Sequence, residues 1–497
     1  MVIGIMAIGN HGKSHLEPGR DGACTDDAPV CNEDIDAAAE RRLVRKLDII
    51  IIPTFFIIYM MSFLDRINIS NARIQDMPKD LDLSGKKFNV ALLVYYASYI
   101  LLEIPSNMIV KKVRPSLYMS TLMFSWGVVN MCMGFVHSYQ ALVGLRFMLG
   151  VFEAGVLPAI VYITSTYYKR HECQKRMSLL FCSTVVAGAF GGLLAFAIGK
   201  LGGREGFRAW RWIFIIEGAV TAVLAVVASF TIIDWPEQTK YLTREEKELL
   251  RRRAENDVGD MVRMDTLNKF SLQLIASDYK IWLGGLMYFG VGVAGLSGAM
   301  FLPTILVEFH WEPEQAQVRT IPVYVFAAGT MLLGAYASDR LKHRFGFIVG
   351  GASMTTVGYA MLLSQDGKTR DYKFAAVFLV FGGAYMIAPM ALVWLQNNVS
   401  GHWKRSFAAS TQVMVGNVAG IVGSLIFVAD ESPRYTTGYS VSLCLMWVGI
   451  CAALAMFMLM RRENGKRAAG RRDDRLALPE DVQANLGDWH PSFRFTL

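Results

Sequence analysis

The sequence predicts an all-α membrane protein with twelve transmembrane helices in two six-helix bundles. Of its 497 residues, 53% are hydrophobic and 19% are charged, whereas soluble domains contain about 25% charged residues. The hydrophobic residues gather in runs such as Leu47–Leu64 and Val90–Val110, which approach the roughly 20 residues that a helix needs to cross a bilayer. The polar segment 234–279 separates six runs from six others, and this equal division indicates two related halves.

Short polar or basic turns separate the expected spans within each half. The spans are 47–72, 87–110, 115–136, 139–166, 177–200 and 210–233, followed by 280–306, 318–339, 346–365, 374–396, 407–429 and 439–460. The expected organisation is an N-terminal cytosolic tail (1–46), a first bundle (47–233), a cytosolic linker (234–279), a second bundle (280–460) and a C-terminal cytosolic tail (461–497). The first tail is polar and has no basic start followed by an apolar core, so we expect disorder and no cleavable signal peptide.

Lysine and arginine residues cluster in alternate loops, and this predicts the orientation. The clusters are Arg41, Arg42, Arg45 and Lys46; Lys111, Lys112 and Arg114; Lys169, Arg170, Lys175 and Arg176; Arg251, Arg252 and Arg253; Arg340, Lys342 and Arg344; Lys404 and Arg405; and Arg461 and Arg462. All of them fall on one side in the twelve-span topology, and basic loops stay in the cytosol. We therefore expect both termini in the cytosol and the protein in the plasma membrane, with a vacuolar membrane as the alternative. The net charge of +8 is explained by these loops, and we expect no nucleic-acid partner.

The linker contains a helix start signal. Thr243 is followed three residues later by Glu246 in the segment TREEKELLRRR, 243–253. This is the spacing of a capping box, in which each side chain bonds to the backbone N–H of the other residue. We expect a short surface helix whose charges form a solvated cytosolic face.

Six ionisable side chains lie inside the apolar spans, where each costs at least about 2.5 kcal/mol to insert. They are Asp65, Arg66, Glu103, Arg146, Glu153 and Glu217. Such groups face protein or water and are functional candidates by default. Arg146 and Glu153 are seven residues apart, which is about two turns, so they share one face of the fourth span.

The charged residues of the first and fourth spans are expected at similar depths in the membrane. Asp65 lies roughly 27 Å along the first span from its cytosolic end, and Arg146 and Glu153 lie about 30 Å and 20 Å along the fourth. If both spans line one cavity, two cations and two carboxylates share a single layer. An anion that pairs with arginine competes with a carboxylate for it, and the released carboxylate then binds a proton more readily. Anion and proton would therefore bind together, as a symporter requires. The alternative is a buried ion-pair set that only joins the two helices.

Four segments together resemble one transporter family. They are FLDRINISNA (63–72), YILLEIPSNMIVKKVRPS (99–116), RFMLGVFEAGVLPA (146–159) and WRWIFIIEG (210–218). They resemble the anion:cation symporter family of the major facilitator superfamily, and most closely its fungal allantoate-permease-like branch. The resemblance covers about residues 42–460 and implies two six-helix bundles, alternating access and transport of small organic anions with protons.

The resemblance also implies roles for the charged residues. By resemblance, Asp65 and Glu153 are proton carriers, and Arg66 and Arg146 are contacts for the anion. Glu103 and Glu217 are expected to be structural or gating residues. The turn with Asp339 and Arg340 resembles the G-x-x-x-D-R-x-x-R-R loop of the superfamily. Arg114 follows the second span in the corresponding place. We expect these three residues to serve topology and gating.

Polar residues of the second half and the tyrosines are weaker candidates. Asn417 is a candidate substrate contact, with a helix–helix hydrogen bond beside Gly416 and Gly420 as the alternative. Tyr95 and Tyr96 can supply hydroxyl groups, although aromatic packing is the favoured interpretation.

The predicted function is uptake of a small organic anion (a carboxylate, vitamin or ureide-like compound) by proton symport with alternating access. The alternative is proton-coupled efflux of a metabolite or drug, although the fifth span reads AGAFGGLLA (187–195) and lacks the proline typical of antiporters. A nutrient sensor is a third possibility. We expect no enzyme, no metal and no cofactor besides protons, because no nucleotide loop, metal spacing or nucleophile–base pair is present. We expect a monomer whose partners are the substrate and the bilayer.

Overall fold

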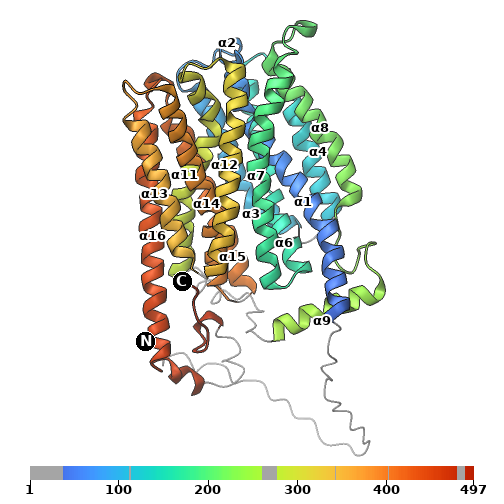
Figure 1. The fold of residues 1–497 in the computed structure, drawn as a ribbon. Helices are drawn as coiled ribbons and strands as arrows, with labels where there is room; N and C mark the ends of the chain where they lie inside the picture. The colour runs from blue at the N-terminus through green and yellow to red at the C-terminus, as the bar shows by residue number, and fades with distance from the viewer. Residues whose placement is uncertain (1–36, 111–112, 260–276, 342, 401, 478–486) are drawn as a thin grey trace, which may run out of the picture.

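The computed structural model describes residues 37–110, 113–259, 277–341, 343–400, 402–477 and 487–497. Within these ranges the chain forms helices and no strands (Figure 1). Most of the predicted N-terminal tail and the linker residues 260–276 lie outside the described residues.

Among the described residues, ten helices are long and apolar enough to cross a membrane. They are α1 (Ala37–Arg73), the broken helix α5–α6 (Tyr139–Glu153 and Val156–Tyr167), α7 (Arg170–Gly199), α8 (Ala209–Thr231), α11 (Tyr279–Glu308), α12 (Pro313–Leu341), α13 (Arg344–Leu363), α14 (Arg370–Asn397), α15 (His402–Ile426) and α16 (Thr436–Ala468). The remaining elements are α2 (Met77–Asp80), α3 (Lys87–Val110), α4 (Pro115–Met133) and α9 (Arg244–Gly259), with short 3-10 turns at 204–206, 429–431, 473–477 and 487–489. The prediction of an all-helical membrane protein is confirmed, whereas the count of twelve spans stays a prediction.

Helix α1 is buried on one face in its first half and on all faces in its second half. In its first half the buried residues Leu43, Leu47, Ile51 and Phe55 recur every four residues, which places them on one face. From Met61 to Ala72 every residue is buried. This second part is enclosed by other helices on all sides, and it carries Asp65 and Arg66.

The predicted fourth span is interrupted at Ala154 and Gly155, between α5 and α6. Pro158 has no backbone N–H, so it cannot bond to the carbonyl of Ala154 four residues earlier. The break follows directly after Glu153, which is the last residue of α5.

The helices pack as two groups. In the first group α4 packs against α8, α1 against α7 and α3 against α5; in the second, α13 packs against α14 and α11 against α15 and α16. In Figure 1, α4 and α8 lie at one edge of the molecule and α13 and α16 at the other. The groups meet mainly through α7 with α12, α3 with α15 and α1 with α11, and α7 also touches α14. A side chain at Gly188 of α7 would overlap the Tyr324 ring of α12, so this contact depends on glycine.

The two ends of the molecule differ in charge. We call the end with the start of α1, α9 and the end of α16 the basic end, and the opposite end, with α2, the far end (Figure 1). At the far end the groups contact each other directly: Asn89 of α3 donates to the carbonyls of Ser424 (2.6 Å) and Phe427 (2.9 Å). The guanidinium of Arg73 of α1 lies 5.5 Å from the ring of Phe301 of α11, a distance typical of cation–π contacts.

Helix α9 is attached to the first group at the basic end. The predicted capping box is confirmed, since the N–H of Thr243 donates to Glu246 at 2.8 Å and the N–H of Glu246 donates to Thr243 at 3.2 Å. The prediction that the linker charges are solvated is wrong for Arg253, which is 1% exposed and pairs with Glu40 and Glu172 at 2.9 Å. The linker helix is therefore held against α1 and α7.

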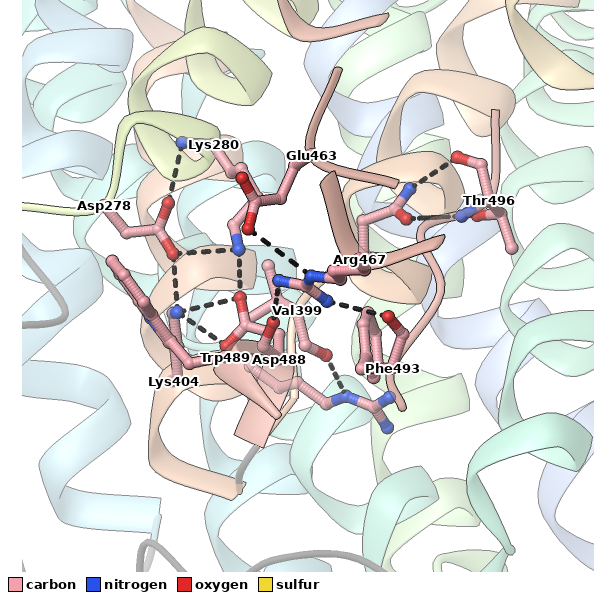
Figure 2. A network of polar contacts seen from close by, with 12 residues as sticks. Asp278, Lys280, Val399, Lys404, Glu463, Arg467, Asp488, Trp489, Phe493 and Thr496 are labelled. Carbon is pink, nitrogen blue, oxygen red and sulfur yellow. Dashed lines mark hydrogen bonds and ion pairs between the residues drawn. The ribbon is translucent and has the colours of Figure 1, made fainter. Parts of the chain in front are cut away.

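Residues 487–497, which we call the strap, pack on the basic end of the second group. The Asp488 carboxylate pairs with Lys280 of α11 and with Lys404 of α15 (2.8 Å), and Asp278 pairs with Lys404 at 2.5 Å (Figure 2). Arg467 of α16 donates to the carbonyl of Asp488 at 2.9 Å. The four charges are at most 5% exposed, so two cations and two anions offset one another inside the protein.

Backbone and aromatic contacts hold the rest of the strap. Asn398, the residue directly after α14, accepts from the N–H of Thr496 at 2.8 Å. The indole of Trp394 in α14 donates to the carbonyl of Thr496 at 2.9 Å. Phe495 is buried, and its N–H donates to Asn464 at 2.9 Å. The strap thus connects α11, α14, α15 and α16.

Asp278 and Lys404 keep their ionised forms over a wider pH range than isolated side chains do, because the pKa of each is shifted by its partners. Burial works to raise the pKa of Asp278, but Lys280 and Lys404 outweigh it and hold this pKa below its ordinary value. Burial works to lower the pKa of Lys404, but Asp488 and Asp278 raise it above the ordinary value. The aspartate contribution to stability is lost only as pH falls through its lowered pKa, and the lysine contribution only as pH rises through its raised pKa.

Replacing Asp488 by alanine is expected to release the strap. The change leaves Lys280 and Lys404 to share Asp278, and breaking a buried ion pair in this way costs about 3 kcal/mol. In the variant, trypsin digestion at Arg494 should become faster and the melting temperature in detergent should fall. The parent protein should show slow cleavage between about pH 5 and pH 9. Asp474→Ala, at an exposed aspartate, is the control and should change neither. Equal cleavage of both variants would contradict the assigned role of Asp488.

Candidate functional site

The candidate site lies where the enclosed part of α1 meets the end of α5 and the middle of α3. Glu153 is fully buried. Its Oε2 atom accepts hydrogen bonds from the hydroxyl of Tyr95 (2.6 Å), the hydroxyl of Ser62 (3.2 Å) and the guanidinium of Arg66 (3.3 Å). Its Oε1 atom has no hydrogen-bond partner among the described residues. One oxygen is thus saturated and the other is available.

Arg66 is placed by aromatic rings as well as by its carboxylate. Its guanidinium lies 5.3 Å from the ring centres of both Tyr95 and Tyr99. The side chain is only 6% exposed, and its Nε has no partner in the described part of the chain. The ion pair with Glu153 is therefore a single contact that leaves donor capacity on the arginine.

Arg146 occupies the same buried stripe of α5, together with Leu142, Gly150 and Glu153. It is 1% exposed, and neither Nε nor Nη2 has a hydrogen-bond partner among the described residues. Its guanidinium lies 6.0 Å from the Phe214 ring. A buried guanidinium whose fork lacks an acceptor is strongly attractive for a carboxylate, because two parallel hydrogen bonds match that geometry.

The Asp65 carboxylate accepts its hydrogen bonds from α4 and α8, away from Glu153. It accepts from Asn130 (2.7 Å) and Trp126 (3.1 Å) of α4 and from Thr221 (2.9 Å) of α8. A fourth donor, Asn68, lies at 3.5 Å. The structure brings Arg66 to Glu153, as expected for one layer, but it joins Asp65 to the interior of the first group. Four donors are thus directed at this carboxylate, and the predicted proton-coupling role of Asp65 stays a prediction.

Three other predicted residues are buried side chains without hydrogen-bond partners among the described residues. Glu103, Glu217 and Asn417 are 2%, 2% and 8% exposed. The carboxylate oxygens of both glutamates and the Nδ2 of Asn417 have no hydrogen-bond partner within the described ranges.

The predicted gating residues lie at the basic end. Arg114 is exposed and directly precedes α4. In the turn between α12 and α13, Asp339 accepts from Arg344 at 3.3 Å, and Arg340 donates to Tyr336 at 3.2 Å. These contacts stay within the loop and its flanking helices.

Sequence reasoning underestimated Tyr95, which was interpreted as a packing residue, and it did not select Ser62, Trp126, Asn130 or Thr221. A usable signal exists for Tyr95, because Tyr95, Tyr99 and Glu103 are spaced by four residues and share one face of α3. Ser62 also lies four residues before Arg66, on the same side of α1. The donors to Asp65 come from distant helices and carry no comparable signal.

The arrangement has two buried arginines, of which Arg66 pairs with the Glu153 carboxylate and Arg146 lies on the same stripe of α5. The helices that carry them belong to the first of the two contacting groups. A family model described as Major Facilitator Superfamily matches residues 55–424. The chain belongs to the Major Facilitator Superfamily. Its membership agrees with the ten membrane-spanning candidates and makes the chain a multi-pass membrane transporter by family.

Relatives within the Major Facilitator Superfamily are fungal transporters. The chain is 34% identical to an uncharacterized transporter of Schizosaccharomyces pombe over 93% of this chain and 91% of that protein. It is 30% identical to a high-affinity nicotinic acid transporter of Saccharomyces cerevisiae over 92% of this chain and 85% of that protein.

A solved structure of the same superfamily fold is similar in shape. It is a crystal structure of a bacterial homolog to the human lysosomal transporter Spinster, described as inward-facing and occupied. The TM-score is 0.61 at 16% identity, and the match covers 82% of this chain and 96% of that chain. At this identity the likeness supports the fold alone.

Proposed function

We propose that the protein takes up a small organic anion by proton symport with alternating access. In this proposal the carboxylate of the substrate binds the free fork of Arg146 and competes with Glu153 for Arg66. Glu153 then takes up a proton, because it loses the cation that stabilises its charge. Binding of anion and proton is coupled reciprocally, as linkage requires.

The observation that carries the proposal is the set of unused hydrogen-bonding atoms around Glu153. Arg146 Nε and Nη2, Arg66 Nε and Glu153 Oε1 are all buried and without partners among the described residues. Buried polar atoms are normally satisfied, so this cluster suits a polar ligand. The similarity to a nicotinic acid transporter supports a small carboxylate as that ligand.

The proposal includes the finer architecture and location. We infer that α3 and α4 complete twelve spans in two six-helix bundles, and that the chain belongs to the anion:cation symporter family and its fungal allantoate-permease-like branch. The basic end then faces the cytosol with both termini, and the plasma membrane is the proposed location of a monomer. The positive-inside rule supports this orientation.

Uptake of labelled nicotinate and of a panel of other carboxylates tests the proposal in cells that lack their own carriers. Uptake should rise as the external pH falls and should collapse when a protonophore is added. Net outward flux driven by an inward proton gradient would instead assign proton-coupled efflux and overturn symport.

A further inference from the structure

Glu103 is a buried carboxylate that the proposed cycle does not use. It lies on α3 at positions i+4 and i+8 from Tyr99 and Tyr95, so the three side chains share one face. Tyr95 bonds to Glu153, and both tyrosine rings flank Arg66. Glu103 therefore continues the stripe of the candidate site by one turn toward the basic end.

The groups around Glu103 come from both helix groups. Arg66 and Tyr59 of α1 face it from the first group, and Tyr288 of α11 and Asn417 of α15 face it from the second. Helices α3 and α15 approach closely here, because a side chain at Gly420 would overlap the Tyr96 ring.

Glu103 and Asn417 are complementary and close to each other, but their atoms do not meet the geometry of a hydrogen bond. Both oxygens of Glu103 lack a donor and the Nδ2 of Asn417 lacks an acceptor within the described part of the chain. An amide donor on one group thus faces a carboxyl acceptor on the other without using it. A relative movement of the groups is the change that would bring the two atoms together or apart.

Arg66 is a cation that interacts electrostatically with Glu103, and it pairs with Glu153 in this conformation. An ionised carboxylate at 2% exposure without a hydrogen bond or a paired cation is strongly unfavourable. Glu103 accordingly carries a proton here, whereas Glu153 carries the charge that pairs with Arg66. Both carboxyl groups act on the same guanidinium, Glu153 through the ion pair and Glu103 through a charge interaction.

We propose that Glu103 is a second coupling residue that alternates with Glu153 as the partner of Arg66. This inference rests on the proposed symport. When the substrate carboxylate has displaced Arg66 from Glu153 and stays bound at Arg146, Glu153 takes up a proton. Arg66 then moves along the stripe, away from Glu153, and pairs with Glu103. Glu103 then gives its proton to water at the basic end, and its carboxylate accepts from Arg66 and from Asn417. One proton is bound at Glu153 and one is released at Glu103, so the summed charge of the three side chains is unchanged and the bound anion adds its own negative charge.

Glu103→Gln tests this role in the full-length protein with radiolabelled nicotinate. The variant keeps the shape of the side chain but cannot release a proton. We expect the KM for nicotinate to stay within about twofold of the parent, exchange of internal for external nicotinate to continue, and net accumulation to fall at least tenfold with a flattened pH profile. Glu217→Gln is the matched control, since it replaces a glutamate of equal exposure in α8, and its pH profile should equal that of the parent.

A second variant keeps the proposal testable if the Glu103→Gln protein does not reach the membrane. Glu103→Asp keeps a titratable group but shortens its reach to Arg66, and its pH profile should be displaced while net accumulation is partly retained. A parental pH profile in either variant would overturn the role of Glu103. Absence of proton-driven uptake in the parent itself would instead refute the proposed symport, so the two failures are distinguishable.

Discussion

Replacing Arg146 by lysine is expected to reduce nicotinate uptake about 100-fold while the protein still reaches the membrane. Lysine keeps the charge but loses the planar fork, and an incorrectly paired buried ionic contact costs about 2–5 kcal/mol. The effect should appear mainly as a raised KM, because the arginine is proposed to hold the anion.

Arg211→Lys is the matched control for this substitution. Arg211 is also a buried arginine of the first group, at 8% exposure, but it donates to the backbone carbonyl of Gly134 at 2.9 Å. This variant should retain most of the uptake. Parental uptake by Arg146→Lys would remove Arg146 from the anion site.

Replacing Glu153 by glutamine is expected to abolish proton-driven accumulation but to preserve exchange of substrate across the membrane. Glutamine still accepts from Tyr95 and Arg66, but it cannot bind and release a proton. Accumulation should fall at least about tenfold, which corresponds to about 1.4 kcal/mol, and uptake should no longer depend on external pH.

Ser62→Ala provides the comparison for Glu153→Gln. It removes one of the three donors to the same oxygen, at 3.2 Å, but leaves the carboxyl group titratable. We expect a small change in rate and a pH profile like that of the parent. Accumulation by Glu153→Gln at the parental level would place proton coupling at another residue.

The helices were predictable because lipid imposes simple constraints. Hydrophobic runs and basic loops are local features, and so is the capping box of Thr243 and Glu246, which the structure contains as predicted. The break after Glu153 was not predicted, although Gly155 and Pro158 stand directly behind it. A span can continue across such a break because both pieces remain apolar.

The directions of the charged side chains were only partly predictable. Asp65 and Arg66 are neighbours, but successive residues of a helix point about 100° apart, so one reaches α4 and α8 and the other reaches Glu153. Helical spacing cannot identify the partner on another helix. The pairing of Asp488 with Lys280 joins residues 208 positions apart. No local sequence pattern predicts a contact between residues so far apart.

The strap affects how the protein is handled in the laboratory. The carbonyl of Leu497 accepts from the N–H of Arg344 at 3.1 Å, two residues after the buried ring of Phe495. A fluorescent reporter fused directly behind Leu497 would crowd this junction and lower the yield of folded protein for reasons unrelated to transport. A reporter placed before Met1, or one separated by a long glycine–serine linker, avoids that artefact.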